Sequence, residues 1–238
     1  MIIAVDIGNS RIKWGVRGDS GWIARDALPT TEAARLEEIA SQWPSNSVVV
    51  ACNVAGEGVG RIAESALQQR HRLHWLRSAS RTCGVSNAYE QPEKLGADRW
   101  AAMIGARGRT DSACIVVCAG TATTVDYLDA DGVFRGGLII PGINLMRASL
   151  ARNTAQLPLA EGEYRDEPRS TVDAIASGCL HAQVGAIERL FSRVANEPGA
   201  VCLMTGGAAP RLVPHLSIPY LLAENLILEG LVRFGASL

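Results

Sequence analysis

The sequence predicts an α/β protein built from two similar halves, and three observations lead to this fold class. After an opening set of strands, short apolar runs alternate with segments of helical spacing. A strand–turn–strand unit whose first strand ends at Asp6 recurs with a first strand that ends at Cys118, nearly half the chain later. The turns of the two units, D-I-G-N-S and C-A-G-T-A, are similar. This similarity indicates two copies of one supersecondary unit.

The first half opens with antiparallel strands and continues with helices and strands in alternation. The apolar run at 2–6 is a buried strand, and a Gly-rich turn at 18–21 separates the second strand from the third. Hydroxyl residues and an early acid after Pro29 are typical of a helix start. The expected strands are 2–6, 12–16, 22–24, 47–51 and 73–76. One expected helix begins at 29–32, and a second covers about 58–70.

The second half repeats this order. Its clearest helix is 171–194, where apolar residues follow the three–four spacing of one buried face. The expected strands are 114–117, 123–128, 133–140 and 200–204, and a closing helix is expected at 224–234. A polar stretch at 109–112 marks the boundary between the halves, so the predicted domains are residues 1–110 and 111–238.

Composition excludes several classes of protein. The chain has 238 residues, of which 47% are apolar, and its formal net charge is −1. That balance argues against binding to a nucleic-acid backbone, which needs a basic excess. No segment has the roughly 20 apolar residues that cross a bilayer, and the cysteines form no CxxC pair. We therefore expect a cytoplasmic protein with reduced cysteines that binds neither nucleic acid nor membrane.

The turn after the first strand is the first candidate site. The strand delivers the Asp6 carboxylate, and Gly8 permits a positive φ and lets a phosphate approach the backbone N–H groups. Lys13 can reach a phosphate from the returning strand, and Asp6 would hold Mg²⁺ through water. An ordinary β-hairpin is the alternative, because short Gly-rich matches recur by chance. The candidate phosphate-binding residues are Asp6, Ile7, Gly8, Asn9, Ser10, Arg11, Ile12 and Lys13.

Two later segments suit the same kind of site. C-A-G-T-A-T-T-V-D at 118–126 is a second hairpin of small residues with a hydroxyl at Thr121, although a Thr-rich strand gives the same pattern. T-G-G-A at 205–208 lets a flat ring or a ribose come close, although a simple strand–helix turn is the alternative.

The three segments in this order resemble the sugar-kinase/actin-like ATPase superfamily. The resemblance implies two ribonuclease H-like (actin-like) domains, each with a mixed, five-stranded type of sheet flanked by helices. It also implies that the two hairpins clamp the β- and γ-phosphates of ATP while the Gly-Gly loop takes the adenosine.

A fourth segment, Y-E-Q-P-E-K-L-G-A-D-R at 89–99, places an acid beside a base. Pro92 favours a helix start, with Asp98 and Arg99 in the first turns. Adjacent residues do not share a helical face, so one could meet a hydroxyl while the other grips a carboxylate, which suits the guanidinium fork. The alternative is a solvated acid–base pair on a surface helix.

With this segment, the chain resembles the type III pantothenate kinases. The shared motifs are D-x-G-N-[ST]-x-x-K, Y-x-x-P-x-x-L-G-x-D-R, G-T-A-x-T-x-D and G-G-x-x-x-P-G, the last at 136–142. The resemblance implies that residues 6–13 and Thr121 contact ATP, that Asp98 accepts a proton, and that the protein is a homodimer. It implies that pantothenate binds to Tyr89, Gly96, Ala97, Asp98, Arg99 and Thr171. Ser170 or Thr171 also has a local use, because either can cap the long helix.

The chain departs from that family at Cys118. Most members carry Asp there, and the resemblance implies that this carboxylate holds a monovalent cation, K⁺ or NH₄⁺. A neutral thiol is a poor ligand for a hard cation, so the cation is held differently, is not needed, or is missing at a cost to catalysis. A subgroup with Cys here resembles accessory factors of virulence gene regulation, which leaves a regulatory protein as one alternative. A kinase of the same superfamily that acts on another small hydroxylated substrate is the second.

Overall fold

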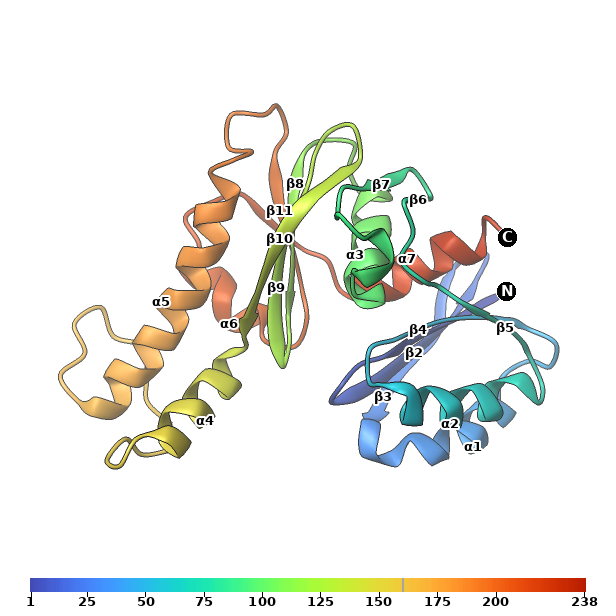
Figure 1. Cartoon of the computed structure of the whole chain (residues 1–238), viewed down its shortest axis with the longest axis horizontal. Helices are drawn as coiled ribbons and strands as arrows, with labels where there is room; N and C mark the ends of the chain where they lie inside the picture. Colours follow the sequence, from blue (N-terminus) through green and yellow to red (C-terminus); the bar gives the residue numbers. More distant parts are fainter. Residues whose placement is uncertain (160) are drawn as a thin grey trace. The chain divides into compact units, whose positions relative to one another are not determined.

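A computed structural model describes residues 1–159 and 161–238 of the chain (Figure 1). The predicted α/β fold is confirmed, because helices accompany two sheets of mixed strand direction. Contacts divide the chain into two compact units. Unit 1 contains Met1–Asp111, Asp131–Arg135 and Asn225–Leu238, and unit 2 contains Ser112–Ala130 and Gly136–Glu224.

Unit 1 contains a five-stranded sheet built from β1 (Ile2–Ile7), β2 (Arg11–Gly18), β3 (Gly21–Pro29), β4 (Val48–Asn53) and β5 (Arg72–Trp75). Their order is β3-β2-β1-β4-β5, so β1 is central. It pairs antiparallel with β2 and parallel with β4. In this register Asp6 is the Cα partner of Lys13 on one side and of Cys52 on the other.

The two faces of this sheet carry different residues, because successive side chains of a strand point to opposite faces. Ile3, Val5 and Ile7 form a core with helices α1 (Leu36–Ser41) and α2 (Glu57–Gln68). Asp6 therefore points to the other face, as does Cys52 beside it. Both are covered, since Asp6 is 5% exposed and Cys52 is 0% exposed.

Helices α3 (Ala97–Arg107) and α7 (Leu226–Gly235) cover that other face of the sheet (Figure 1). Helix α7 packs against β1 and β4, where Gly235 lies against the side chains of Ile2 and Val50. The two helices approach closely, because a Cβ added to Gly230 would lie 1.8 Å from the carbonyl oxygen of Ala101. This close approach fixes α3, the helix that begins beside Asp98.

The position of α7 makes the compact units differ from the predicted domains 1–110 and 111–238. Segment 225–238 packs within unit 1, together with 131–135. The reason is the apolar face of α7, on which Leu226 and Leu231 are fully buried. Units of contact are not by themselves folding domains, so the predicted domain ranges stay a prediction.

Unit 2 repeats the strand arrangement of unit 1. It contains β8 (Cys114–Ala119), β9 (Ala122–Leu128), β11 (Val201–Thr205), β12 (Tyr220–Leu222) and the later part of β10 (Val133–Pro141). β8 and β9 form an antiparallel hairpin, and β11 runs parallel to β8, as β4 does to β1. The predicted recurrence of one supersecondary unit is therefore present in the fold.

Helix α5 (Thr171–Phe191) supplies much of the core of unit 2. Its Leu180 and Ile187 pack with Ile115 and Val125 from the hairpin strands, as the three–four spacing predicts. The other helical elements of the unit are α4 (Ile143–Asn153), α6 (Ala209–Leu212) and the 3-10 turn η3 (Val213–His215).

The two helix starts predicted at prolines open short 3-10 turns and not α-helices. Strand β3 runs through Pro29, where it pairs with Arg11, and the 3-10 turn η1 (Thr30–Arg35) follows before α1. Pro92 starts only the short turn η2 (Pro92–Lys94), because the backbone is extended at Leu95. Asp98 and Arg99 consequently lie in the first turn of a separate helix, α3. The remaining strands of unit 1 are β6 (Arg81–Thr82) and β7 (Val85–Asn87).

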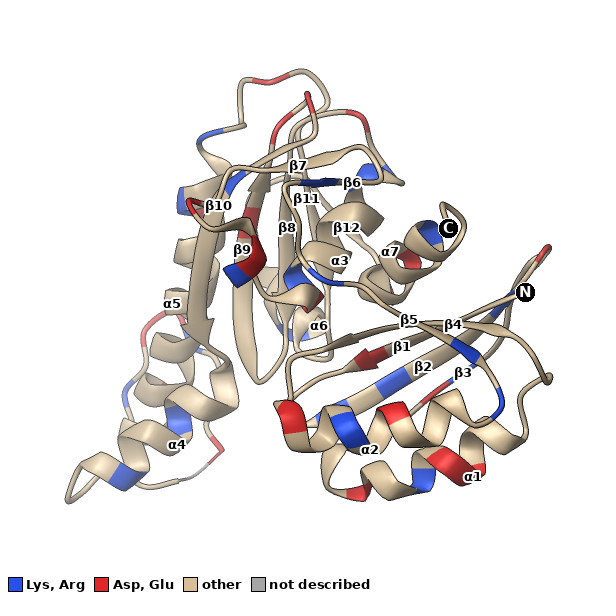
Figure 2. Cartoon of the chain, turned by 45° about the vertical axis from the view of Figure 1, so that its right-hand side comes forward, with Lys and Arg blue, Asp and Glu red and all other residues tan. Residues whose placement is uncertain are grey.

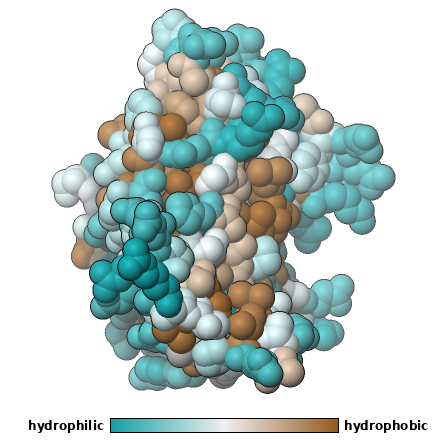
Figure 3. Space-filling model, turned by 90° about the vertical axis from the view of Figure 1, so that its left-hand side faces the viewer, coloured by the Kyte–Doolittle hydropathy of each residue, from teal (hydrophilic) through white to brown (hydrophobic). Residues whose placement is uncertain are grey.

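The surface mixes charge and apolar area. Figure 2 shows Lys and Arg interspersed with Asp and Glu over helices and strands, in keeping with a net charge of −1. Figure 3 shows apolar patches among hydrophilic side chains on one face. Exposed large apolar residues of unit 2 include Leu138 and Ile139 on β10 and Leu145 on α4. In the part of the chain that the structure describes, no helix is long and apolar enough to cross a membrane.

The contact between α3 and α7 predicts the effect of two glycine substitutions. Gly230→Ala forces a methyl group into the Ala101 carbonyl, so the free energy of unfolding should fall by about 1–3 kcal/mol. Gly178→Ala in α5 is the matched control, because nothing lies within 4 Å of an added Cβ there. It should leave stability unchanged or raise it by up to about 1 kcal/mol. Urea unfolding measures both, and equal midpoints for the two variants would contradict this account of the packing.

Candidate active site

Asp6 is the buried centre of the candidate site. It lies near the end of β1, where the Cys52 thiol donates a hydrogen bond to Asp6 Oδ1 at 3.6 Å. Lys13 is the Cα partner of Asp6 on β2. Sequence reasoning identifies Asp6 and Lys13, because they belong to one hairpin. It misses Cys52, because a parallel neighbour from a distant strand leaves no signal in local spacing.

Burial sets the acidity of this carboxyl group. Desolvation raises the pKa of Asp6 to about 6, the Lys13 charge opposes that rise, and the Asp98 charge adds to it. Burial, followed by the charges of Asp6 and Asp98, also raises the pKa of Cys52 well above its usual range. Asp98 is therefore within electrostatic range of both groups. Three residues predicted from two separate motifs, Asp6 and Lys13 from one and Asp98 from the other, lie together in unit 1.

The turn after β1 is held by a hydrogen bond within it and by two hydrogen bonds from Thr30, a residue outside the turn. The Gly8 N–H donates to the Arg11 carbonyl at 3.0 Å. The φ of Gly8 is not positive, so that expected reason for glycine is wrong. A Cβ at this position would lie 3.1 Å from the Arg11 carbonyl oxygen, which gives a local reason for glycine. Thr30 Oγ1 donates to the Gly8 carbonyl at 2.7 Å, and the Thr30 N–H donates to the Ser10 carbonyl at 3.1 Å. Sequence patterns do not identify Thr30, because only the pairing of β2 with β3 brings it to the turn.

Asp98 lies in the first turn of α3. The Arg99 N–H donates to Asp98 Oδ1 at 2.8 Å. A Cβ on Gly96, the N-cap residue, would lie 2.7 Å from the same oxygen. Glycine at the N-cap therefore leaves room for the carboxylate to turn back over the start of the helix.

Arg99 is buried among aromatic rings and is not part of a solvated surface pair. It is 4% exposed, and its Nη1 donates to the Tyr89 hydroxyl at 2.9 Å. Its guanidinium carbon lies 5.7 Å from the ring centroid of Tyr89 and 5.6 Å from that of Phe134. The surface-pair alternative is therefore wrong for Arg99. Phe134, which no sequence motif marks, belongs to the same cluster.

The second hairpin is held by two other predicted segments of unit 2. The Gly142 N–H donates to the Thr121 carbonyl at 2.9 Å, and a Cβ on Gly142 would lie 2.2 Å from the Gly120 carbonyl. The Ala208 N–H, in the T-G-G-A loop, donates to the Ala119 carbonyl at 3.1 Å. The P-G motif and the Gly-Gly loop thus both pack against the turn that contains Thr121.

Thr171 is the first residue of α5 and is exposed. Ser170 caps the helix, since its side chain accepts a hydrogen bond from the Asp173 N–H at 3.2 Å. Of the two capping candidates the structure therefore selects Ser170. Thr121 and Thr171 belong to unit 2, and the other predicted site residues belong to unit 1.

The residues present suit one of the two implied kinds of cation, Mg²⁺ bound with ATP, better than the other, a monovalent cation. Cys118 lies opposite Thr124 at the end of β8 and offers only a thiol, which does not suit a hard monovalent cation. Among the described residues, no group of three or more His, Cys, Asp or Glu side chains could hold a metal ion. Mg²⁺ bound with ATP is a different case, because it needs one or two carboxylates beside the phosphates. The Asp6 carboxylate fits that need.

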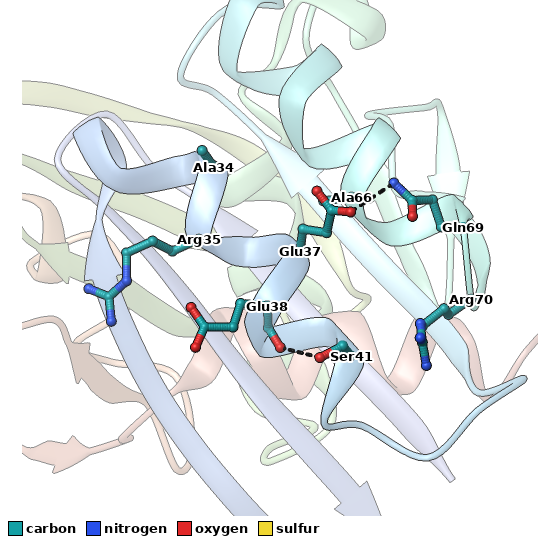
Figure 4. Close-up of a pocket in the computed structure, with 8 residues that line it drawn as sticks. All are labelled: Ala34, Arg35, Glu37, Glu38, Ser41, Ala66, Gln69 and Arg70. Carbon is teal, nitrogen blue, oxygen red and sulfur yellow. Dashed lines mark hydrogen bonds between the residues drawn. The ribbon is translucent and has the colours of Figure 1, made fainter.

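Two hollows in unit 1 differ in their relation to these residues. One, of about 550 Å³, is bordered by η1, α1 and α2 and lined mainly by charged and polar side chains, and Gln69 donates to Glu37 across it (Figure 4). It contains no predicted site residue. The other, of about 660 Å³, is lined in part by Asn53, Gly96 and Ala97. The second hollow therefore adjoins the start of α3 and the candidate site.

Solved structures define the class of protein. A conserved putative Baf family transcriptional activator from Campylobacter jejuni matches with a TM-score of 0.66 and 21% identity over 99% of this chain and 98% of that chain. A putative 2-dehydro-3-deoxygalactonokinase from Sinorhizobium meliloti matches with a TM-score of 0.61 and 14% identity over 100% and 97%. At these identities the likeness shows the fold alone. It is the fold of the sugar kinases and actin-like ATPases.

Sequence comparison then gives the family. The family model described as type III pantothenate kinase matches residues 2–193. Proteins named type III pantothenate kinase from Aromatoleum aromaticum and Dechloromonas aromatica are 52% and 50% identical over 232 residues. These matches cover 97% of this chain and 96% and 97% of theirs. The chain belongs to the type III pantothenate kinase family, which confirms the resemblance seen in its motifs.

Because the Asp6 carboxyl group is buried, we expect its replacement by a neutral side chain to stabilise the folded protein to an extent that depends on pH. Its pKa is raised from 3.8 to about 6 in the folded chain. The neutral form therefore favours folding below pH 3.8, and this contribution is lost as the pH rises through 6. At pH 8 Asp6→Asn removes a buried charge, so the nucleotide-free variant should be more stable than the unsubstituted protein by roughly 1–3 kcal/mol.

Urea unfolding at pH 4.5 and pH 8 measures this difference. The gap between variant and unsubstituted protein should be large at pH 8 and small at pH 4.5. Asp19→Asn, in the exposed turn between β2 and β3, is the control and should show no pH-dependent gap. An Asp6→Asn gap that is the same at both pH values would contradict the assigned burial of charge.

Proposed function

We propose that this protein transfers the γ-phosphoryl group of ATP to the primary hydroxyl of pantothenate. The product is 4′-phosphopantothenate, and the reaction is the first step of coenzyme A synthesis. Membership of the family supports this reaction. The structural observation that carries it is the placement of two carboxylates in unit 1, Asp6 on β1 opposite Lys13 and Asp98 in the first turn of α3, where the Arg99 N–H fixes it. One carboxylate suits a metal-bound triphosphate, and the other suits an alcohol.

In this proposal ATP binds through its phosphates to the turn at 6–13 and to Thr121. Backbone N–H groups of a tight turn and the Lys13 ammonium suit phosphate oxygens. Mg²⁺, held through water by Asp6, would supply the charge neutralisation that phosphoryl transfer needs. The Thr30 brace and the Arg11 carbonyl hold the turn in one shape before ATP arrives. Such preorganisation is the main contribution of a protein to this reaction.

Asp98 accepts the proton of the pantothenate hydroxyl as that oxygen attacks in line. The Arg99 N–H already holds Asp98 Oδ1, which fixes the orientation of the carboxylate. Gly96 leaves the space in which this orientation is possible. A positioned carboxylate of this kind contributes about 10²–10⁴-fold to the rate.

Pantothenate is held by Tyr89, Gly96, Ala97, Arg99 and Thr171. Arg99 is the natural partner of the substrate carboxylate, because a guanidinium presents its donors as a fork. The support from the structure is the direct Arg99–Tyr89 hydrogen bond and the burial of Arg99 in the first turn of α3, beside the half-buried Tyr89.

A coupled assay of ADP release tests the proposed function. With Mg²⁺ and ATP, pantothenate should support turnover, and a panel of sugars and acetate should not. Turnover with a sugar but not with pantothenate would assign a different kinase, and no turnover with any acceptor would leave the regulatory alternative. The assay with K⁺, with NH₄⁺ and with neither shows whether a chain with Cys118 needs a monovalent cation.

Asp98→Asn separates chemistry from nucleotide binding. The amide cannot accept the proton, so kcat should fall by about 10²–10⁴-fold. Asp98 belongs to the start of α3 and not to the phosphate-binding turn, so the Kd for ATP should change by less than about threefold. Steady-state kinetics and ATP titration measure the two quantities. Wild-type turnover in the Asn variant would exclude Asp98 as the base.

We also propose that the protein is a cytoplasmic homodimer. The exposed large apolar side chains of unit 2 support this, because Leu138, Ile139 and Leu145 are 40–64% exposed and association would remove apolar surface from water. Sedimentation equilibrium should give about twice the chain mass of 25.3 kDa. Leu145→Glu should shift that equilibrium toward the monomer. A monomeric mass for the unsubstituted protein at micromolar concentration would contradict the dimer.

A further inference from the structure

Phe134 is a fully buried aromatic residue beside the two side chains proposed to bind pantothenate. It is 0% exposed. Its ring centroid lies 5.3 Å from that of Tyr89, with 33° between the ring planes. The guanidinium carbon of Arg99 lies 5.6 Å from the Phe134 centroid and 5.7 Å from the Tyr89 centroid. One phenyl ring thus contacts both binding residues.

The backbone connects the same residues. β7 pairs in parallel with the beginning of β10, where Asn87 is the Cα partner of Phe134. The Ala88 N–H donates to the Phe134 carbonyl at 3.1 Å. The Asn87 side chain then fastens the following loop. Its Oδ1 accepts from the Tyr89 N–H at 3.1 Å, and its Nδ2 donates to the Pro92 carbonyl at 3.1 Å.

The chemistry of the ring suits a guanidinium that is out of water. Arg99 is 4% exposed, and a buried cation must be compensated by groups around it. An aromatic face carries partial negative charge and attracts a cation within about 6 Å of its centroid. Two such faces, with the Tyr89 hydroxyl as acceptor at 2.9 Å, fix the plane of the guanidinium as well as its position.

We propose that Phe134 is a positioning residue for pantothenate, which acts through Arg99 and Tyr89 without touching the reacting atoms. This inference rests on the proposed function. By holding the guanidinium and the phenol in their binding arrangement beforehand, Phe134 removes ordering that substrate would otherwise have to impose. The effect falls on the affinity for pantothenate and not on ATP or on the phosphoryl-transfer step.

Phe134→Leu is the direct test, because it keeps an apolar side chain and removes the aromatic face. The KM for pantothenate should rise by about 3- to 30-fold, the range that corresponds to one desolvated cation–π contact. The kcat and the KM for ATP should stay within about twofold. Phe191→Leu is the matched control, because Phe191 is 4% exposed in the core of unit 2. It should lower the melting temperature and leave the KM for pantothenate unchanged.

A double-substitution cycle shows whether Phe134 acts through Arg99. Arg99→Lys keeps the charge but loses the planar guanidinium. If the ring positions that guanidinium, Phe134→Leu in the Arg99→Lys background should raise the KM for pantothenate by less than about twofold further. Equal effects in both backgrounds would overturn the assigned mechanism.

Each remaining outcome decides between the two proposals. If the unsubstituted protein does not phosphorylate pantothenate, the proposed function fails and this inference fails with it. If it does, and the KM for pantothenate is unchanged in Phe134→Leu, only the positioning role is overturned. Phe134→Met, which fills the space with a flexible apolar chain, replaces Phe134→Leu if the latter does not fold. Failure of both variants to fold would assign Phe134 to core packing instead.

Discussion

A carboxylate buried at the end of a central strand is the constraint on which unit 1 depends. Asp6 is 5% exposed and its pKa is raised to about 6. At neutral pH the folded chain therefore keeps a buried negative charge at a cost in stability. The surroundings limit the cost, because Lys13 and the Cys52 thiol both favour the charged form. A charge retained against desolvation is a feature of functional sites. Here it prepares the place where a cation and a triphosphate are proposed to bind.

The parts of the candidate site come from segments that are far apart in the chain. β1 carries Asp6, β4 brings Cys52, and the start of α3 brings Asp98 into electrostatic range of both. Helix α7 then fixes α3 from the end of the chain, through a contact in which only glycine fits at position 230. The geometry of the candidate site is therefore as much a consequence of helix packing on one face of the sheet as of the motifs themselves.

The two copies of the internal repeat share a strand arrangement but carry different side chains. Both units have a hairpin, β1–β2 and β8–β9, with a parallel strand beside it. At the end of the first strand, unit 1 has a buried carboxylate, and unit 2 has the thiol of Cys118. The second hairpin is instead held by its own neighbours, since Gly142 and Ala208 donate to its carbonyl groups. The repeat thus keeps the hairpin backbone while the residue at this position of the first strand differs between the two copies.

The sequence by itself determined the fold class, the repeat and the residues of the two turns, because strand periodicity, Gly-rich turns and acid–base spacing are local properties. The motifs also sufficed for the family. Tertiary structure decided what depends on partners distant in sequence. It placed Cys52 beside Asp6, Thr30 against the turn, and Phe134 against Tyr89 and Arg99. It also assigned α7 to unit 1 and showed that the helices predicted after Pro29 and from Pro92 begin as short 3-10 turns. Strand pairing and side-chain burial set these features, and neither leaves a mark in local spacing.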